Sequence, residues 1–553
     1  MVVEVDGKIC TSSSRQKRLR VRSRASPCPA LMAMLFLCEG IVHTSSIHAL
    51  LQWHTRRWTE LHGPPETGVR DALGSAVRSG VGRLTTAFLL VGEELVLLGR
   101  IVWPIVITSF LLYSRSVVSM LFLGRLGGAE LAGGSLAIAF ANITGYSVLK
   151  GLAMGMEPIC GQAFGAKRWS VLAHTFQKTL LLLLLATIPI SLLWLSMEPI
   201  LLRLGQDAAI TSVAKDYLLY SFPDLIAQAY LHPLRIFLRT QSHTKPLTFC
   251  AAFALLLHFP ANYFLASYLD CGVKGVALAS SWNTISIDLG LVGFLLRSED
   301  SIKPWAGLSR EGIRGWRPLL GLALPSAASI CLEWWWYEVM LLLCGRLPDP
   351  RAGVAAMGVL IQTTGLIYVL PASLGMGLST RVGHELGANR PARARHAALV
   401  GLSVAAAVGS LAFAFTVVVR HAWGRMFTDE QPTLALTSAA LPIVGMCELG
   451  NCPQTAGCGV LRGSARPAVG AKINFSSFYV IGLPVAAVAG FRLGFGFLGL
   501  WLGLVAAQAS CVCLVLCTVA RTDWEAEAKR AEELTGAAAA QRERDELSVT
   551  LLA

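Results

Sequence analysis

Charged residues are scarce in this sequence. Asp, Glu, Lys and Arg make up 15% of its 553 residues, whereas soluble proteins carry about 25%. Two motifs are also lacking: no CxxC pair occurs, and no GxxxxGK[ST] loop that would bind nucleotide phosphates. The 14 cysteines are too sparse for a disulfide scaffold, and the hydrophobic fraction reaches 54%. These features exclude a soluble enzyme, a disulfide-stabilised secreted domain and an ATP-driven pump, and they indicate an integral membrane protein.

The basic residues lie where a membrane protein keeps them. The net charge is +13, but six Arg and Lys residues crowd into positions 15–24, and most others lie in short gaps between apolar runs. Loops beside membrane helices are typically rich in Lys and Arg. We therefore expect membrane lipid, and no nucleic acid, among the partners.

Twelve segments from residue 98 onward are long and apolar enough to cross a membrane. A helix needs roughly 20 mainly apolar residues to span ~30 Å of hydrocarbon. With cytoplasmic termini, the loops after even-numbered spans hold 17 Lys and Arg residues and the opposite loops hold 9, which favours that orientation. The predicted spans are centred near Phe110, Ile143, Leu184, Leu225, Leu257, Leu289, Trp335, Gly365, Ala407, Ile443, Val480 and Val505.

The sequence repeats itself at an interval of 221 to 222 residues. GLAMGMEPICGQAFGAKR (151–168) and SLGMGLSTRVGHELGANR (373–390) are identical at 7 of 18 positions. Pro104 and Pro325 are separated by nearly the same interval, as are two Gly-Arg-Leu triplets. Three landmarks in register indicate two tandem halves of six spans each. Such halves insert the same way up, an arrangement typical of transporters that open to each side in turn.

Five long motifs resemble the plant branch of the multidrug and toxic compound extrusion (MATE) transporters, also called DETOXIFICATION proteins. They are WPIVITSFLLYSRSVVSMLFLGRLGGAELAG (103–133), MEPICGQAFGA (156–166), CLEWWWYE (331–338), CGVLRG (458–463) and NFSSFYVIGLP (474–484). The resemblance implies a MATE-like, all-α integral membrane protein with twelve transmembrane helices in two pseudo-symmetric six-helix lobes. It also implies a secondary antiporter that exports small organic solutes in exchange for protons. Such solutes include xenobiotics, organic cations and hormone-like metabolites.

Two other functions stay open. A lipid-linked precursor flippase has a related two-lobed architecture, although its cavity usually carries several basic groups, whereas the mid-span positions here offer carboxylates and aromatic rings. A sodium-coupled exporter is the second. In each case we expect a monomer without cofactor or metal site, in the plasma membrane or a vacuolar or endosomal membrane, with both termini cytoplasmic.

Glu333 is the leading candidate for proton coupling. An ionisable group in hydrocarbon is costly, so a carboxylate within a span is a functional candidate. Glu333 lies about two turns after Pro325 and is followed by three tryptophans and Tyr337. Aromatic neighbours exclude water and so disfavour the charged carboxylate, which would let the group take up a proton. The resemblance places Glu333 at the family's essential C-lobe carboxylate; a structural carboxylate paired within the bundle is the alternative.

The tenth span departs from the family pattern. Many members carry an aspartate three residues before Gln454, where this chain has Asn451, which cannot titrate. Glu448 lies three residues earlier, on the same helical face. We predict that Glu448 replaces the missing aspartate as the partner of Glu333; a helix-end carboxylate without a role is the alternative.

Other residues of the spans have lesser predicted roles. Pro104 and Pro325 are expected to kink their helices, because each lacks the N–H that would bond four residues back, although proline is also tolerated in membrane helices without such a role. The residues predicted to line the substrate cavity are Asn451, Gln454, Trp334 and Tyr337. The polar residues expected to be mainly structural are Glu338, Asp288 and His258.

The expected division of the chain follows the spans. Residues 1–92 form a basic and poorly structured extension, for which a transit peptide is an alternative. The remaining parts are a first six-helix lobe (93–297), a cytoplasmic linker (298–316), a second six-helix lobe (317–521) and a polar cytoplasmic tail (522–553).

Overall fold

The computed structural model describes residues 80–203, 205–298 and 315–536, and every regular element within these ranges is a helix. The chain divides into two compact units, residues 1–88 and residues 89–553. The predicted extension up to residue 79, most of the predicted linker and the tail after residue 536 lie outside the described residues.

The first lobe contains the helices that precede the linker. They are α4 (Gly80–Leu126), α5 (Gly128–Ala141), the π-helix η1 (Asn142–Tyr146), α6 (Ser147–Ala153), α7 (Met156–Gly165), α8 (Trp169–Leu195), α9 (Met197–Arg203), α10 (Ala208–Leu219), α11 (Phe222–Thr240), α12 (Lys245–Asn262), the π-helix η2 (Tyr263–Tyr268) and α13 (Gly272–Arg297).

The second lobe follows the linker. It contains α14 (Arg317–Cys344), α15 (Pro350–Gly387), α16 (Pro391–Trp423), the short 3-10 helix η5 (Gly424–Met426), α17 (Gln431–Gly463), α18 (Pro467–Asn474), the π-helix η6 (Phe475–Gly482), α19 (Leu483–Ala487), the π-helix η7 (Val488–Arg492) and α20 (Gly496–Ala520). A last helix, α21 (Trp524–Thr535), follows it.

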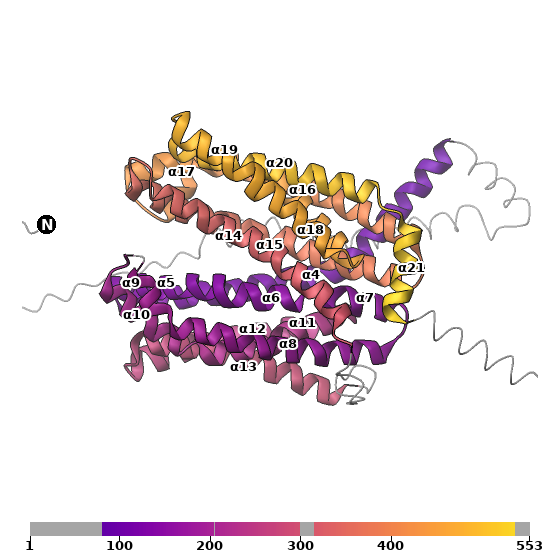
Figure 1. The fold of residues 1–553 in the computed structure, drawn as a ribbon, viewed down its shortest axis with the longest axis horizontal. Coiled ribbons are helices and arrows are strands. Elements are labelled where there is room, and N and C mark those ends of the chain that lie inside the picture. The colour runs from indigo at the N-terminus through magenta and orange to yellow at the C-terminus, as the bar shows by residue number, and fades with distance from the viewer. Residues whose placement is uncertain (1–79, 204, 299–314, 537–553) are drawn as a thin grey trace, which may run out of the picture. The chain divides into compact units, whose positions relative to one another are not determined.

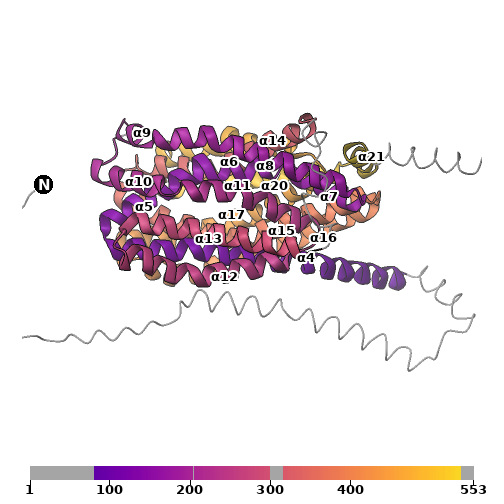
Figure 2. The same cartoon turned by 90° about the horizontal axis from the view of Figure 1, so that it is seen from below.

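The twelve predicted spans all coincide with helices, which confirms the all-α membrane fold. The two lobes lie side by side as two layers of helices with similar directions (Figures 1 and 2). Ten helical segments of the described chain are long and apolar enough to cross a membrane. The exceptions are the α10–α11 pair and α13, whose polar residues, such as Asp224 and Asn283, turn into the lobe and are each 2% exposed.

The repeated motif forms the closest contact between the lobes, where α7 packs against the end of α15. A Cβ added at Gly161 would lie 3.6 Å from Cα of Gly383, and one added at Gly383 would lie 3.4 Å from Cα of Gly161. Gly165 and Gly387, also 222 residues apart, each face a backbone carbonyl of the other lobe so closely that a Cβ would overlap it. The glycines of the repeat therefore let two helix backbones touch across the pseudo-symmetry axis.

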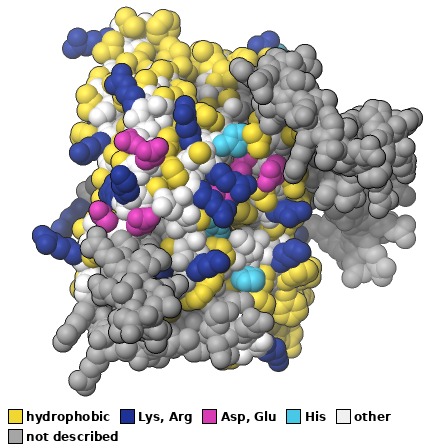
Figure 3. Space-filling view, turned by 90° about the vertical axis from the view of Figure 1, so that its right-hand side faces the viewer, with side chains coloured by type: hydrophobic (Ala, Val, Ile, Leu, Met, Phe, Trp, Pro, Cys, Tyr) yellow, Lys and Arg dark blue, Asp and Glu magenta, His cyan; other side chains and the backbone are white. Residues whose placement is uncertain are grey.

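Helix α21 lies at the same end of the molecule as α7 in both views (Figures 1 and 2). The Asp523 carboxylate caps it by accepting hydrogen bonds from two N–H groups of the first turn, those of Glu525 and Ala526, at 3.1 Å each. Its apolar face contacts α15 and α16 of the second lobe and α7 of the first. Lys and Arg side chains gather on this end (Figure 3), which is the predicted cytoplasmic one.

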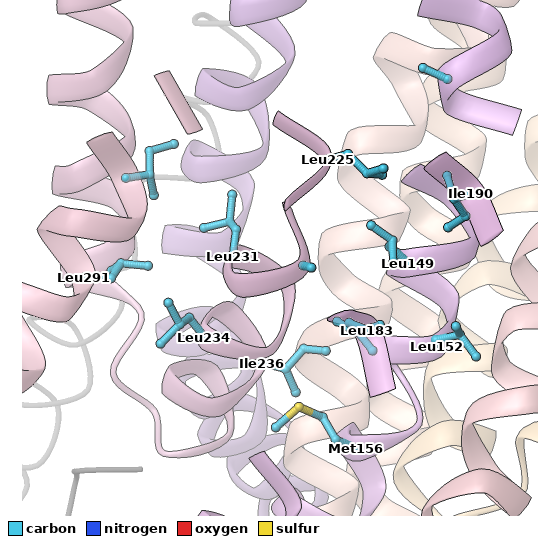
Figure 4. Close-up of a cluster of buried hydrophobic side chains, with 14 of the residues drawn as sticks. Leu149, Leu152, Met156, Leu183, Ile190, Leu225, Leu231, Leu234, Ile236 and Leu291 are labelled. Atoms are coloured by element: carbon cyan, nitrogen blue, oxygen red, sulfur yellow. The ribbon is translucent and has the colours of Figure 1, made fainter. Parts of the chain in front are cut away.

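The core of the first lobe is aliphatic. Leu149 of α6, Leu183 of α8, Leu225 and Leu234 of α11 and Leu291 of α13 converge from four helices (Figure 4). Each is at most 3% exposed. Such close packing supports movement of the lobe as one body.

We predict that Gly387→Ala destabilises the protein, because the new methyl group would overlap the Gln162 carbonyl of the other lobe. The expected loss is about 1–3 kcal/mol of unfolding free energy. Thermal unfolding of the purified protein in detergent measures it. Gly365→Ala in the same helix is the matched control, since nothing lies within 4 Å of its added Cβ. Equal melting temperatures for the two variants would contradict the close approach.

Candidate transport site

The aromatic run of α14 is divided between two sides of the helix, because consecutive residues turn by 100°. Trp336 is fully buried against the aromatic rings of η6. Trp334 and Trp335 are 37% and 41% exposed and face the first lobe. Lys150 Nζ lies 5.0 Å from the Trp334 ring centroid, and Trp335 Nε1 donates to the Ile143 carbonyl at 3.3 Å. This run therefore presents two indole rings at the junction of the lobes.

Glu333 lies on the inner side of the second lobe, half-buried. Its nearest polar neighbours are Tyr368 of α15 and Gln454 of α17. The basic groups within electrostatic range are Arg462 of the same lobe and Lys150 of the first. The predicted coupling residue thus stands where both lobes contribute polar groups.

Glu448 of α17 is 1% exposed. Asn451 Nδ2 donates to its Oε2 at 2.8 Å, and Cys452 Sγ lies 3.8 Å from the same oxygen. Its Oε1 has no hydrogen-bond partner among the described residues. Glu333 is within electrostatic range of Glu448, and Tyr337 is within range of both carboxyl groups. Both acids of the predicted pair therefore lie in the second lobe, on α14 and α17, and their coupling stays a prediction.

Asn451 and Gln454 are almost completely buried and use their amides within the second lobe. Gln508 Nε2 donates to Asn451 Oδ1 at 3.4 Å, and Gln454 Nε2 donates to Asn474 Oδ1 at 3.3 Å. Their role in binding substrate stays a prediction. Trp334 is exposed and Tyr337 is half-buried, so of the predicted cavity residues these two are the more accessible to a solute.

A polar cluster that the sequence analysis missed lies inside the first lobe. Asp224 of α11 pairs with Arg115 of α4, whose Nη1 is 3.4 Å from Oδ1. The Tyr146 hydroxyl donates to Oδ2 at 2.6 Å, and the Thr284 hydroxyl donates to Oδ1. Asp224 is therefore neutralised and fully hydrogen-bonded. A search of the spans for basic as well as acidic residues would have found Arg115.

The remaining predicted residues have the following places. His258 is buried and lies 3.1 Å from Ser119 Oγ. Asp288 is half-buried, with an Oδ1 that has no partner among the described residues. Pro104 and Pro325 stand within α4 and α14, which both continue past them, so a kink there stays a prediction.

A network of ion pairs joins the lobes beside α7. Glu157, whose side chain is 0% exposed, lies 2.9 Å from Arg239 Nη2 of the first lobe and 3.7 Å from Arg462 Nε of the second. The Gln162 amide donates to the Gly463 carbonyl at 3.0 Å beside it. The count of basic loop residues included Arg239, but α11 contains it. This end of the molecule is thus closed by charged and hydrogen-bonded contacts between the lobes.

No group of three or more His, Cys, Asp or Glu residues in the described ranges is placed to hold a metal ion. The chemistry available at the junction of the lobes is therefore that of carboxyl groups, basic side chains, amides and aromatic rings.

Comparison with known families supports the repeat. The MatE family model matches the chain twice, over residues 104–264 and 325–488. The two matches begin at Pro104 and Pro325, the same prolines that mark the internal repeat. Together they cover more than half of the chain.

Relatives and solved structures agree with the family model. Protein DETOXIFICATION 53 of Arabidopsis thaliana is 57% identical over 450 residues, which cover 81% of this chain and 93% of that protein. Protein DETOXIFICATION 48 of the same plant is 55% identical over 80% of this chain and 83% of its own length. The crystal structure of the eukaryotic MATE transporter AtDTX14 superposes with a TM-score of 0.77 at 30% identity, over 81% of this chain and all of that one.

The fold extends to more distant proteins. The Vibrio cholerae MATE transporter VcmN, in its bent form, superposes with a TM-score of 0.68 at 17% identity, over 81% of this chain and 99% of that one. At this level of identity the likeness concerns the fold alone. With the family model and the plant relatives, it leads to one conclusion: the chain belongs to the MATE family and is a multi-pass membrane transporter.

Proposed function

We propose that this chain exports small organic solutes in exchange for protons, by alternating access between its two lobes. The lobes, taken as residues 93–297 and 317–521, would rock about the contact between α7 and α15. Glu333 and Glu448 would bind and release the coupled proton. The two-lobed fold and the tandem family match support the mode of transport, and the carboxyl pair supports the coupling.

The observation that carries the proposal is the buried carboxyl of Glu448, with its unpartnered Oε1, beside Glu333. A carboxyl group in such surroundings is stable either when it is protonated or when its charge is paired with a cation. A cationic group of the solute and a proton would therefore compete for the same pair, which is the requirement for exchange. Asn451, next in the same network, holds Glu448 in place through its amide.

We infer the orientation from the charge distribution. The basic residues at the α7 end (Figure 3) support a cytoplasmic position for that end, and cytoplasmic termini agree with an even number of spans. The proposal places the chain, as a monomer, in the plasma membrane or in a vacuolar or endosomal membrane.

A second candidate gains support from one observation. Lys150, Arg235 and Arg239 lie near one another between the lobes, so basic groups do occur where a flippase for lipid-linked precursors would bind a pyrophosphate. Movement of a polyprenyl diphosphate lipid from one leaflet to the other in proteoliposomes, without efflux of small solutes, would separate this candidate from an exporter. Replacing the pH gradient by a sodium gradient would test sodium coupling in the same vesicles.

Glu333→Gln is expected to abolish proton-driven export. The neutral amide cannot bind and release a proton, so efflux under an imposed pH gradient should fall about tenfold or more, to the rate of leak. Proteoliposomes loaded with a panel of fluorescent organic solutes measure this rate. Export by Glu333→Gln at the wild-type rate, with the same response to the gradient, would exclude Glu333 as the coupling group.

Glu448→Gln tests the second member of the pair. The isosteric amide keeps the volume but removes the charge, and we expect efflux to fall several-fold and to lose most of its dependence on pH. Glu338→Gln is the matched control, because Glu338 lies on α14, half-buried, without a hydrogen bond or ion pair to another described residue. A similar loss in both variants would point to general damage and count against a coupling role for Glu448.

A further inference from the structure

Positive charge is in excess at the junction of the lobes. Arg235, Arg239 and Arg462 all lie within electrostatic range of Lys150. The carboxylates beside these four basic groups are Glu157, which pairs with Arg239 and Arg462, and Glu333. Among the described residues, two of the four positive charges are thus left without a matching anion. An unpaired charge away from water is costly, so its retention indicates a partner that binds there.

The unmatched donors belong to the first lobe. Arg235 makes no ion pair or hydrogen bond to another described residue. Arg239 is 6% exposed, and its Nε has no hydrogen-bond partner among the described residues. Both line a small pocket with Thr108, His243 and Thr244, and no carboxylate lines that pocket. A pocket of guanidinium and hydroxyl donors without a negative group fits an oxyanion.

Lys150 extends this set of donors toward the second lobe. Its ammonium group lies over the Trp334 ring at 5.0 Å, a cation–π contact that leaves the N–H donors free for another partner. The exposed face of Trp334 offers a flat apolar surface next to the charge. An aromatic solute with an acidic group would use both at once.

We propose that the transported solute carries an oxyanion, a carboxylate or a phosphate, which binds Lys150 and Arg235 of the first lobe. The rest of the solute faces Glu333 and Glu448 of the second lobe. Because this basic pair and the carboxyl pair belong to opposite lobes, they suit an amphoteric solute, whose cationic end exchanges with protons at the carboxyl pair while its oxyanion is held by the basic side chains. This substrate class rests on the proposed export of organic solutes.

Ligand-induced stabilisation of the purified full chain tests the proposal without any gradient. A ligand that binds the folded state raises the melting temperature, and the rise at a given concentration is larger the tighter the ligand binds. Two pairs of probes differ only in the oxyanion: tryptophan and tryptamine, and indole-3-propionate and its amide. The member that bears the oxyanion should act at about tenfold lower concentration than its partner.

Variants of the basic residues test whether Lys150 and Arg235 bind the oxyanion. Arg235→Gln and Lys150→Gln should each reduce that tenfold preference to about twofold or less, whereas Arg235→Lys, which keeps the charge, should retain most of it. Arg203→Gln, at an exposed position of α9, is the matched control and should keep the full preference. Melting of each variant without ligand shows whether it folds, and Lys150→Gln carries the test alone if Arg235→Gln does not fold.

Three results would overturn the proposal. They are equal action of tryptophan and tryptamine on the wild type, an unchanged preference in both charge-removing variants, and no stabilisation by either oxyanion probe at millimolar concentration. Comparing benzoate with phenyl phosphate then tells a carboxylate site from a phosphate site, and a preference for either supports the proposal. Because this assay reads binding alone, it can succeed or fail independently of proton-coupled export.

Discussion

Hydrocarbon makes an unpaired charge expensive, and this constraint decides where the ionisable groups of the spans stand. Asp224 forms an ion pair with Arg115 and accepts hydrogen bonds from two hydroxyl groups inside the first lobe. Glu157 is shared by Arg239 and Arg462 where the lobes meet. These structural charges are therefore paired, whereas Lys150, Arg235 and Glu333 at the junction of the lobes have no ion pair among the described residues.

The pseudo-symmetry of the backbone is not matched by the side chains. Glycines at equivalent positions of the repeat let α7 and α15 touch, so the two halves meet in a direct backbone contact. The side chains at the junction differ between the lobes: α6 and α11 supply Lys150, Arg235 and Arg239, whereas α14 and α17 supply Glu333 and Glu448, with Glu157 of α7 and Arg462 of α17 pairing across the contact. Duplication of the fold thus left a symmetric frame on which a polar, asymmetric site could form.

The sequence predicted the two-lobed helical fold. Each span had to be long and apolar, and the landmarks of the two halves recur at one interval. The pairing of Glu333 with Glu448 was predicted from helical spacing and the family pattern; it stays a prediction, and the two acids lie on α14 and α17 of the second lobe. Lys150 and Arg115 escaped prediction, because which face a basic residue presents depends on the rotation of its helix within the bundle. Helix rotation also explains why the α10–α11 pair and α13 are less apolar than the other spans. Their polar residues face the interior of the lobe, so the helices can lie in the membrane although their overall hydropathy is low.

Helix α21 has a consequence for how the protein can be observed. It seats Trp524, Ala528 and Ala531 in the core of the second lobe and also contacts α7 of the first. Separation of the lobes at that end must therefore peel α21 from one of them, and the indole of Trp524 travels with the second lobe. In a variant whose other 13 tryptophans are replaced, a quencher attached to the end of α8 that adjoins α7 would report the distance of Trp524 from the first lobe as the lobes separate.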